Sequence, residues 1–234
     1  CVVALTHSFK RNLVERSIPS SQVHVVLNGV DLPRYKNRQK DLQMFADLGL
    51  EKKFVIGYVG TLGMAHNLEN ALNAASIISD NPNIVFLFVG SGADKVRLEN
   101  ITKKRNLKNV IFLGRKPKES IPKIWNLCDV ALVHLKNEKA FAEVLPSKIF
   151  EALGMGLPIL LVAPEGEASD LVKANECGEW VPAGDPKALS EALISLFTDR
   201  PRLEKYAKVC VELAPYYSRE EQAKKFLMVL QNCL

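Results

Sequence analysis

The chain has 234 residues, of which 47% are hydrophobic and 24% are charged, and this composition is typical of a folded protein with a sizeable core. Its net charge of +5 is small, and its Lys and Arg residues are scattered among acids rather than gathered into a basic stripe. This pattern argues against nucleic acid as a partner, and it leaves a phosphate-bearing small ligand or an anionic membrane surface as alternatives.

The five cysteines stand far apart and lack the Cys-x-x-Cys or Cys/His spacing of a metal site; they are Cys1, Cys128, Cys177, Cys210 and Cys233. We therefore expect buried, reduced thiols and a cytoplasmic protein. No run approaches the roughly 20 apolar residues that span a bilayer. The chain begins with Cys1 rather than Met, which we interpret as a trimmed start.

The first predicted strand lies at 23–27 and ends in Asn28-Gly29-Val30-Asp31, whose Asn-Gly pair favours a left-handed turn. Residues 32–52 are polar and of mixed charge, so they predict a connecting segment with one short helix at 41–48. At the other end of the chain a terminal amphipathic helix is predicted by the stripe Ala223, Phe226, Leu227 and Leu230.

Between these ends, β-rich runs alternate with helical segments. Nearly continuous apolar runs predict strands at 54–59, 84–89, 110–113, 130–135, 158–162 and, more weakly, 179–181. A crossover helix between the first two is predicted by apolar residues at helical spacing, namely Leu68, Ala71, Leu72, Ala75 and Ile78. The sequence therefore predicts an α/β fold with a doubly wound, Rossmann-like parallel sheet.

Three of these strands run into glycine-containing loops, at the sheet edge where ligands of open parallel sheets bind. The loops are Gly60-Thr61-Leu62-Gly63-Met64-Ala65-His66, Gly90-Ser91-Gly92 and Gly114-Arg115-Lys116. Glycine lets backbone N–H groups approach a phosphate, although tight loops also need it for conformational reasons alone. The spacing matches neither Gly-x-Gly-x-x-Gly nor a P-loop, which argues against a nicotinamide dinucleotide and against a nucleoside triphosphate hydrolase.

Among the four histidines, His66 is the candidate donor to a phosphate or sugar, because it lies in the first glycine loop at a helix start. His134 ends an apolar strand, and we expect it to be a core or rim residue.

The most informative stretch is 143–151, Glu-Val-Leu-Pro-Ser-Lys-Ile-Phe-Glu. Ser147 is predicted to cap a helix whose free N–H groups and dipole attract an anion, and Lys148 adds a full positive charge. Glu143 and Glu151 can accept hydrogen bonds from hydroxyls on either side of a bound phosphate. The alternative interpretation is a capped surface helix with two solvated acids.

Taken in order, these motifs resemble the C-terminal half of retaining GT-B glycosyltransferases, from about residue 23 to the end. The ordered set also includes Gly154-Met155-Gly156-Leu157-Pro158 and Gly184-Asp185-Pro186. The resemblance is to the large family of glycosyl transferases group 1, which includes sucrose synthase and capsule and O-antigen enzymes, especially amino-sugar transferases with Pro-Ser-Lys before the second glutamate. It implies a domain that binds a nucleoside diphosphate-sugar, by the family's habit a UDP-sugar, for transfer with retention to a glycan or lipid-linked acceptor in polysaccharide biosynthesis.

The resemblance also implies roles for individual residues. Glu143 would face the donor sugar, and Glu151 would hold the ribose. Family members place an arginine and a lysine in the first glycine loop, where this chain has Thr61 and His66, so Lys148 is the candidate replacement. The expected catalytic residues are thus Glu143, Lys148 and His66. The expected binding residues are Gly60, Thr61, Gly63, Gly90, Ser91, Gly92, Arg115, Lys116, Leu145, Ser147 and Glu151. No cofactor and no metal are expected, since the sequence lacks Asp-x-Asp and clustered carboxylates.

The resemblance further divides the chain into residues 1–21, the tail of an absent N-terminal acceptor domain; 22–214, the nucleotide-sugar-binding domain; and 215–234, a helix that packs back on the absent domain. We expect donor binding with little or no sugar transfer by this polypeptide, weak self-association through the terminal helix, and peripheral contact with the inner membrane leaflet. Two alternatives stay open. A GT-B-like nucleotide-sugar epimerase would need extra acids and histidines that we cannot place, and a non-catalytic nucleotide-binding scaffold is mildly favoured by Thr61 and His66.

Overall fold

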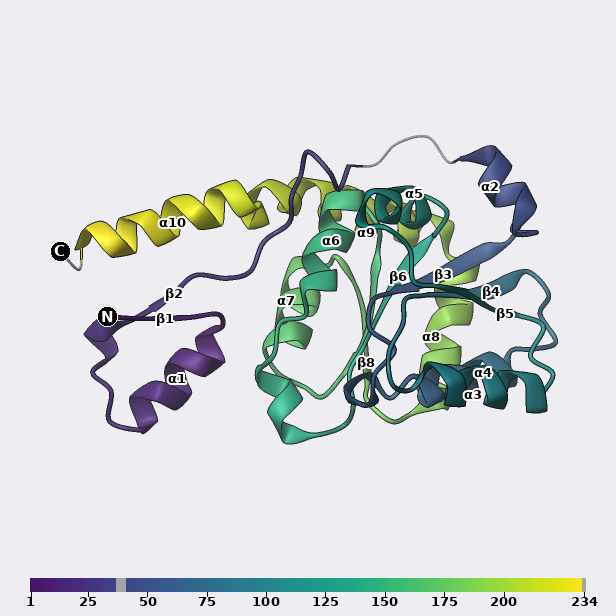
Figure 1. Ribbon diagram of the computed structural model, residues 1–234, viewed down its shortest axis with the longest axis horizontal. Helices are drawn as coiled ribbons and strands as arrows, with labels where there is room; N and C mark the ends of the chain where they lie inside the picture. Colours follow the sequence, from purple (N-terminus) through teal and green to yellow (C-terminus); the bar gives the residue numbers. More distant parts are fainter. Residues whose placement is uncertain (37–40, 233–234) are drawn as a thin grey trace.

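The computed structural model describes residues 1–36 and 41–232, and its centre is an all-parallel six-stranded sheet (Figure 1). In spatial order the strands are β5 (Val110–Gly114), β4 (Ile84–Val89), β3 (Phe54–Val59), β6 (Val130–His134), β7 (Ile159–Ala163) and β8 (Gly178–Pro182). The order reverses between β3 and β6, which makes that position the topological switch point of a doubly wound sheet. The predicted fold class is confirmed, and every predicted strand of the sheet is present within one or two residues.

Helices cover both faces of this sheet. One face is covered by α3 (Leu68–Ile77), α4 (Lys95–Lys104) and α8 (Pro186–Thr198), and the other by α5 (Ile121–Trp125), α6 (Ser147–Met155), α7 (Glu167–Asn175) and α9 (Arg200–Leu213). Strand β3 shows why both faces are apolar, because Phe54 and Ile56 enter one buried cluster while Val55 and Val59 enter the other. Each such fully buried side chain stabilises the fold by about 1.5–3 kcal/mol.

The crossover helix is also confirmed. Helix α3 carries the predicted apolar stripe against the sheet, and all five stripe residues are buried: Leu68, Ala71, Leu72, Ala75 and Ile78. Asn67, which precedes the helix, has φ 41°, and this left-handed residue turns the first glycine loop into α3.

The first 25 residues form a separate βαβ unit, which we call the N-terminal unit. Strands β1 (Val2–Ala4) and β2 (Val23–Val25) pair in parallel, and α1 (His7–Glu15) connects them. The predicted strand at 23–27 is therefore present, but it pairs with β1 rather than with the six-stranded sheet, so a boundary at residue 22 would divide this unit. The carboxylate of Glu167 joins the unit to α7, since it accepts hydrogen bonds from the backbone N–H groups of His7 and Ser8, both at 2.7 Å.

The Asn28-Gly29 turn differs from the prediction. Neither Asn28 nor Gly29 adopts a positive φ, so the expected left-handed turn is wrong. The glycine is needed for a different reason, because a Cβ on Gly29 would lie 2.8 Å from the carbonyl oxygen of Tyr217. Val30 pairs with the same late segment, donating its N–H to Tyr217 at 2.8 Å and accepting from Arg219 at 2.8 Å.

The connecting segment contains the predicted short helix, α2 (Leu42–Asp47), which Asp41 caps by accepting from the Met44 N–H at 3.1 Å. The terminal helix is α10 (Arg219–Asn232), and Figure 1 shows it running past the N-terminal unit and away from the six-stranded sheet. Its apolar side chains are 42–55% exposed at Phe226, Leu227, Met228 and Leu230. Within residues 1–36 and 41–232, no helix is long and apolar enough to cross a membrane.

The thiols follow the prediction in part. Cys128, Cys177 and Cys210 are buried, as expected, whereas Cys1 is exposed. Cys233, like the last residue of the predicted 215–234 segment, lies outside the described residues.

Candidate functional site

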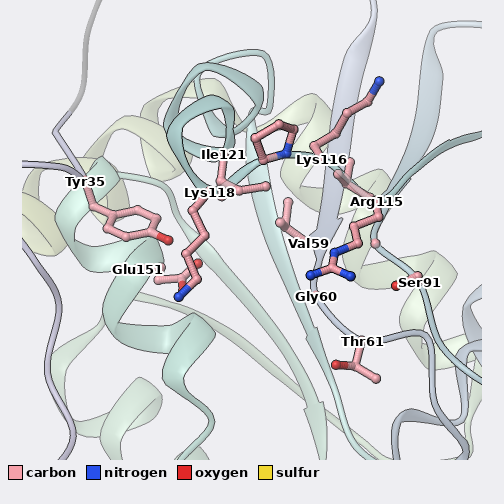
Figure 2. A pocket seen from close by; sticks show the side chains of 13 residues that line it. Tyr35, Val59, Gly60, Thr61, Ser91, Arg115, Lys116, Lys118, Ile121 and Glu151 are labelled. Carbon is pink, nitrogen blue, oxygen red and sulfur yellow. The ribbon is translucent and has the colours of Figure 1, made fainter.

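A cavity of about 680 Å³, which we call the first cavity, opens where β3, β4 and β5 end (Figure 2). Its volume lies in the range typical of small-molecule sites, and its position next to the switch point is where an open parallel sheet binds ligands. It is lined by Tyr35, Val59, Gly60, Thr61, Val89, Gly90, Ser91, Arg115, Lys116, Pro117, Lys118, Ile121 and Glu151. The predicted binding residues among them are Gly60, Thr61, Gly90, Ser91, Arg115, Lys116 and Glu151.

The three glycine loops lie side by side at this cavity. Gly60 donates its N–H to Val89 at 2.8 Å, and Gly90 donates to Gly114 at 2.9 Å. Gly60 and Gly90 have φ values of 146° and 148°, and a Cβ on Gly90 would clash with the Gly60 carbonyl oxygen. The loops therefore pack backbone against backbone, which only glycine allows at Gly90.

Lys148 reaches the first glycine loop from the first turn of α6. A Cβ on Gly60 would lie 2.5 Å from the Lys148 Cε atom, so the absence of a side chain there makes room for the lysine stem. The Lys148 Nζ atom lies 5.1 Å from the centre of the Tyr58 ring, a cation–π distance. Burial lowers the pKa of Lys148, and the charge of Glu151 opposes that shift. The structure thus brings a partly buried cation to the loop that lacks an arginine and a lysine of its own.

Glu151 lies one turn further along α6 and faces the first cavity. Its Oε2 atom accepts a hydrogen bond from the Trp125 indole N–H at 3.3 Å, and the Tyr35 hydroxyl bonds it from another side. Burial raises the pKa of Glu151, while Trp125, Lys148, Tyr35 and Arg219 oppose the shift. A half-buried carboxylate with several donors around it is a defined acceptor for ligand hydroxyl groups.

Tyr35 is a lining residue that the sequence motifs did not identify. It comes from the connecting segment, where it is 9% exposed, and burial together with the neighbouring Glu151 carboxylate raises its pKa to about 12. The available signal was an aromatic side chain soon after Asp31 in an otherwise polar stretch, which is too weak to indicate a contact with Glu151.

The two histidines differ in their surroundings. His66 does not line the first cavity; its Nδ1 atom lies 3.1 Å from the His134 carbonyl oxygen, so Nδ1 carries the proton there. Burial lowers the pKa of His66, and the charge of Lys148 lowers it further. The role of His66 as a ligand donor stays a prediction. His134 is 1% exposed with its Nε2 atom 3.0 Å from Asn70 Nδ2, which confirms it as a core residue.

The helix entry after Glu143 differs from the prediction in one respect. Helix α6 begins at Ser147, and the cap position belongs to Pro146, so Ser147 is not the capping residue and its exposed side chain makes no cap bond. The helix N-terminus nevertheless lies where expected. Of the other predicted binding residues, Leu145 packs against the apolar cluster, and Gly63, Gly92 and Ser147 do not line the first cavity.

Glu143 faces a different space from Glu151. It lies at the end of a short 3₁₀ helix (Lys139–Glu143) and lines a cavity of about 420 Å³, which we call the second cavity. The remaining walls of this cavity come from the N-terminal unit: Val3, Ala4, Leu5, Phe9, Asn12 and Leu13. The two paired acids are therefore divided between two cavities.

The first cavity offers backbone N–H groups, hydroxyls, cations and one acid. Figure 2 shows the Arg115 guanidinium turned into the cavity and the Lys116 ammonium turned away from it. This set of groups fits an anion that also carries hydroxyls. Within residues 1–36 and 41–232, no three His, Cys, Asp or Glu side chains are grouped so that they could hold a metal ion.

Residues 40–210 match the family model described as Glycosyl transferases group 1. Because the match covers most of the 234 residues, the chain belongs to this family. Its six-stranded sheet is the Rossmann-like domain of a GT-B fold. The family and the fold expected from the ordered motifs are thus confirmed.

The chain is similar to several known proteins. It is 30% identical over 159 residues, or 66% of its length and 38% of the relative, to "Putative colanic acid biosynthesis glycosyl transferase WcaI" of Escherichia coli K12. The crystal structure of Anabaena Alr3699/HepE in complex with UDP-glucose superposes with a TM-score of 0.85 and 20% identity over 99% of this chain and 63% of that one. The C-terminal domain of a glycosyl transferase group 1 family protein (LpcC) from Francisella tularensis gives a TM-score of 0.68 and 20% identity over 82% of this chain and 100% of that domain.

Proposed function

We propose that this chain is the donor-binding domain of a glycosyltransferase that moves a sugar from a nucleoside diphosphate-sugar, UDP-sugars foremost, to a glycan or lipid-linked acceptor with retention. One observation carries the proposal: the glycine loops and Glu151 line a single cavity at the switch point, and Lys148 packs against Gly60 of the first loop. The UDP-glucose complex of the structural relative HepE supports a nucleotide sugar as the ligand class.

The proposed pose follows the charges around the first cavity. The diphosphate lies over the glycine loops near Lys148, and the ribose hydroxyls donate to Glu151. The base lies against the loop that carries Arg115 and Lys116. The sugar then extends toward Glu143 and the second cavity.

The chemistry needs a group that stabilises negative charge where it develops. The bond between the anomeric carbon and the diphosphate oxygen breaks, and an acceptor oxygen bonds to that carbon on the same face. The proton of the acceptor hydroxyl passes to the departing phosphate oxygen. Lys148 and the N–H groups of the first glycine loop stabilise the charge on the leaving diphosphate. His66 already donates its Nδ1–H to the His134 carbonyl, so in the neutral ring the remaining Nε2 atom would accept a hydrogen bond from a sugar hydroxyl rather than donate one to the diphosphate.

The acceptor side of the reaction belongs to a larger protein. The chain spans 38% of WcaI and 63% of the HepE chain. We propose that the N-terminal unit is the end of an acceptor-binding domain, and that this domain covers the exposed apolar side chains of α10. We also propose that the protein takes its donor from the cytoplasm and that it makes peripheral contact with the membrane that carries the acceptor. The polypeptide of 234 residues is then expected to bind donor and to transfer little or no sugar.

Calorimetric titration with UDP and a panel of UDP-sugars tests the proposal. Glu151→Gln is expected to weaken UDP and every UDP-sugar alike, because it alters the ribose contact. Glu143→Gln is expected to leave UDP binding unchanged and to remove discrimination among sugars. Glu191→Gln, at an exposed position of α8, is the matched control.

The outcomes separate the alternatives. Failure of the unaltered chain to bind any nucleoside diphosphate would overturn the proposal. Binding that neither glutamate change alters would favour a non-catalytic scaffold, and ordinary transfer rates from this polypeptide alone would contradict the assignment of the acceptor site to another domain.

A further inference from the structure

Tyr35 lines the first cavity, and the proposed pose gives it no role. Its ring packs with the apolar cluster beneath the cavity, and it is 9% exposed. Figure 2 shows its hydroxyl pointing toward the Glu151 carboxylate. The aromatic ring is thus held by packing, while the one polar atom of the side chain is directed at the site.

The backbone of Tyr35 is fixed on two sides. Its N–H donates to the Asp31 carbonyl at 2.8 Å, which closes a turn. Its own carbonyl lies against α6, where a Cβ on Gly154 would be 3.0 Å from the Tyr35 oxygen. Gly154 follows Glu151 on the same helix, so the tyrosine and the glutamate are positioned by one helical surface and their separation is set by packing.

The groups that act on the pKa of Glu151 come from four segments, and Lys118 of a fifth segment lines the same cavity. Trp125 of α5 and Tyr35 donate hydrogen bonds to the carboxylate, while Lys148 of α6 and Arg219 of α10 act through their charge. Two carboxylate oxygens have about four acceptor positions, so two donors leave acceptor capacity for a ligand. The two protein donors therefore fix the orientation of the carboxylate and leave some of its acceptor positions open.

We propose that Tyr35 is a positioning residue of the nucleotide site, whose hydroxyl holds the Glu151 carboxylate in the orientation that accepts hydrogen bonds from ribose hydroxyls. The proposal rests on the proposed function, because it takes a nucleotide as the ligand of the first cavity. It adds a residue that determines nucleotide affinity, and this residue comes from the connecting segment rather than from the stretch 143–151.

The test compares Tyr35→Phe with the unaltered chain, using UDP and 2′,3′-dideoxy-UDP in calorimetric titrations. UDP is expected to bind about tenfold more weakly to the variant, since a hydrogen bond to a charged group is lost. The dideoxy compound lacks the ribose hydroxyls and is expected to bind both proteins with nearly equal affinity. Equal losses for both ligands would mean that Tyr35 only supports the fold of the cavity, and this result would overturn the proposal, as would unchanged UDP binding.

Tyr206→Phe is a matched control. The Tyr206 hydroxyl donates to Glu179 Oε1 at 3.0 Å, which is the same kind of pair, and neither residue lines the first cavity. This variant is expected to keep full UDP affinity. Thermal unfolding of both variants shows whether either change has weakened the fold as a whole.

The pH profile of UDP binding gives a second readout. The Tyr35 hydrogen bond opposes the raised pKa of Glu151, so its removal raises that pKa further. The loss of affinity on acidification should therefore begin at higher pH in Tyr35→Phe, and an unshifted profile would contradict the proposal. Absence of UDP binding by the unaltered chain would overturn the proposed function together with this role, whereas normal binding with a ribose-independent effect would overturn only the role of Tyr35.

Discussion

The first and second cavities are built from different parts of the chain. The first is enclosed by the loops of the six-stranded sheet, by α6 and by Tyr35, all of which are held by the same core. The second has Glu143 on one side and the N-terminal unit on the other, and that unit has only two strands of its own. Under the proposed function, nucleotide affinity then belongs to this chain alone, while sugar selection depends on how the N-terminal unit is held.

The most severe way to break the first cavity is Gly90→Ala. The substitution places a Cβ against the Gly60 carbonyl at a φ of 148°, so we expect a loss of about 3–5 kcal/mol in the free energy of unfolding. Urea denaturation measures it. Gly49→Ala is the matched control, because Gly49 also has a positive φ of 63° but open space around its Cβ position. An equally small loss in both variants would show that the two glycine loops are not closely packed.

Lys148→Met sharpens the comparison by removing the cation that packs against Gly60 of the first cavity, while keeping a side chain of similar length. UDP affinity is expected to fall about tenfold, and UMP affinity to fall less, because UMP lacks the second phosphate. Titration calorimetry measures both. Lys187→Met, on the exposed face of α8, should change neither, and an equal loss for UDP and UMP would place Lys148 away from the diphosphate.

The pH dependence of UDP binding should report the same lysine. Burial lowers the pKa of Lys148 below the ordinary lysine value of about 10.4, so the ammonium is lost at lower pH than at a surface lysine. Affinity should therefore decline as pH rises through this lowered pKa, and Lys148→Met should lack that decline. The free energy of unfolding changes in the opposite direction. It rises with pH through this range, because the lowered pKa means that the unfolded chain binds more protons than the folded one. A decline that persists in Lys148→Met would assign it to another group.

Glu167→Gln tests the second cavity and has the smallest expected effect. The carboxylate bonds the first N–H groups of α1, and loss of its charge there is expected to cost the N-terminal unit about 1 kcal/mol. Amide hydrogen exchange should show faster exchange in residues 2–25 with UDP affinity unchanged. Glu165→Gln is the control, since Glu165 pairs only with the exposed Lys173 among the contacts of the described residues. Weaker UDP binding in Glu167→Gln would show that the two cavities are not independent.

Much of the fold was predictable because strand and helix periodicities are local. The continuous apolar run of β3 and the stripe of α3 both reflect burial against neighbouring elements, and both were predicted correctly. Gly29 was misread because its reason lies at the far end of the chain, where the Tyr217 carbonyl approaches it. A glycine that permits a left-handed turn and a glycine that permits close approach of another backbone look the same in the sequence.

The site was predictable only where it depends on strand ends. The glycine loops meet because parallel strands end at one edge, and Glu151 follows from its place on α6. Ser147 was misread as a cap because Pro146 takes that position. Tyr35 was missed because its partner is brought to it by tertiary packing, and no spacing along the chain records that contact. The division of Glu143 and Glu151 between two cavities likewise could not be predicted from the sequence, because it depends on where the N-terminal unit lies in space.

The pairing of Val30 with Ser218 has one more consequence. The chain leaves the N-terminal unit just before Val30 and returns toward it just after Ser218, so both crossings are tied together at a single pivot (Figure 1). The N-terminal unit is therefore attached at two places, through this pairing and through the bonds of Glu167 to the His7 and Ser8 N–H groups. A change at either attachment would reshape the space beside Glu143, whereas Tyr35 is buried against α6 and belongs to the sheet side of the joint.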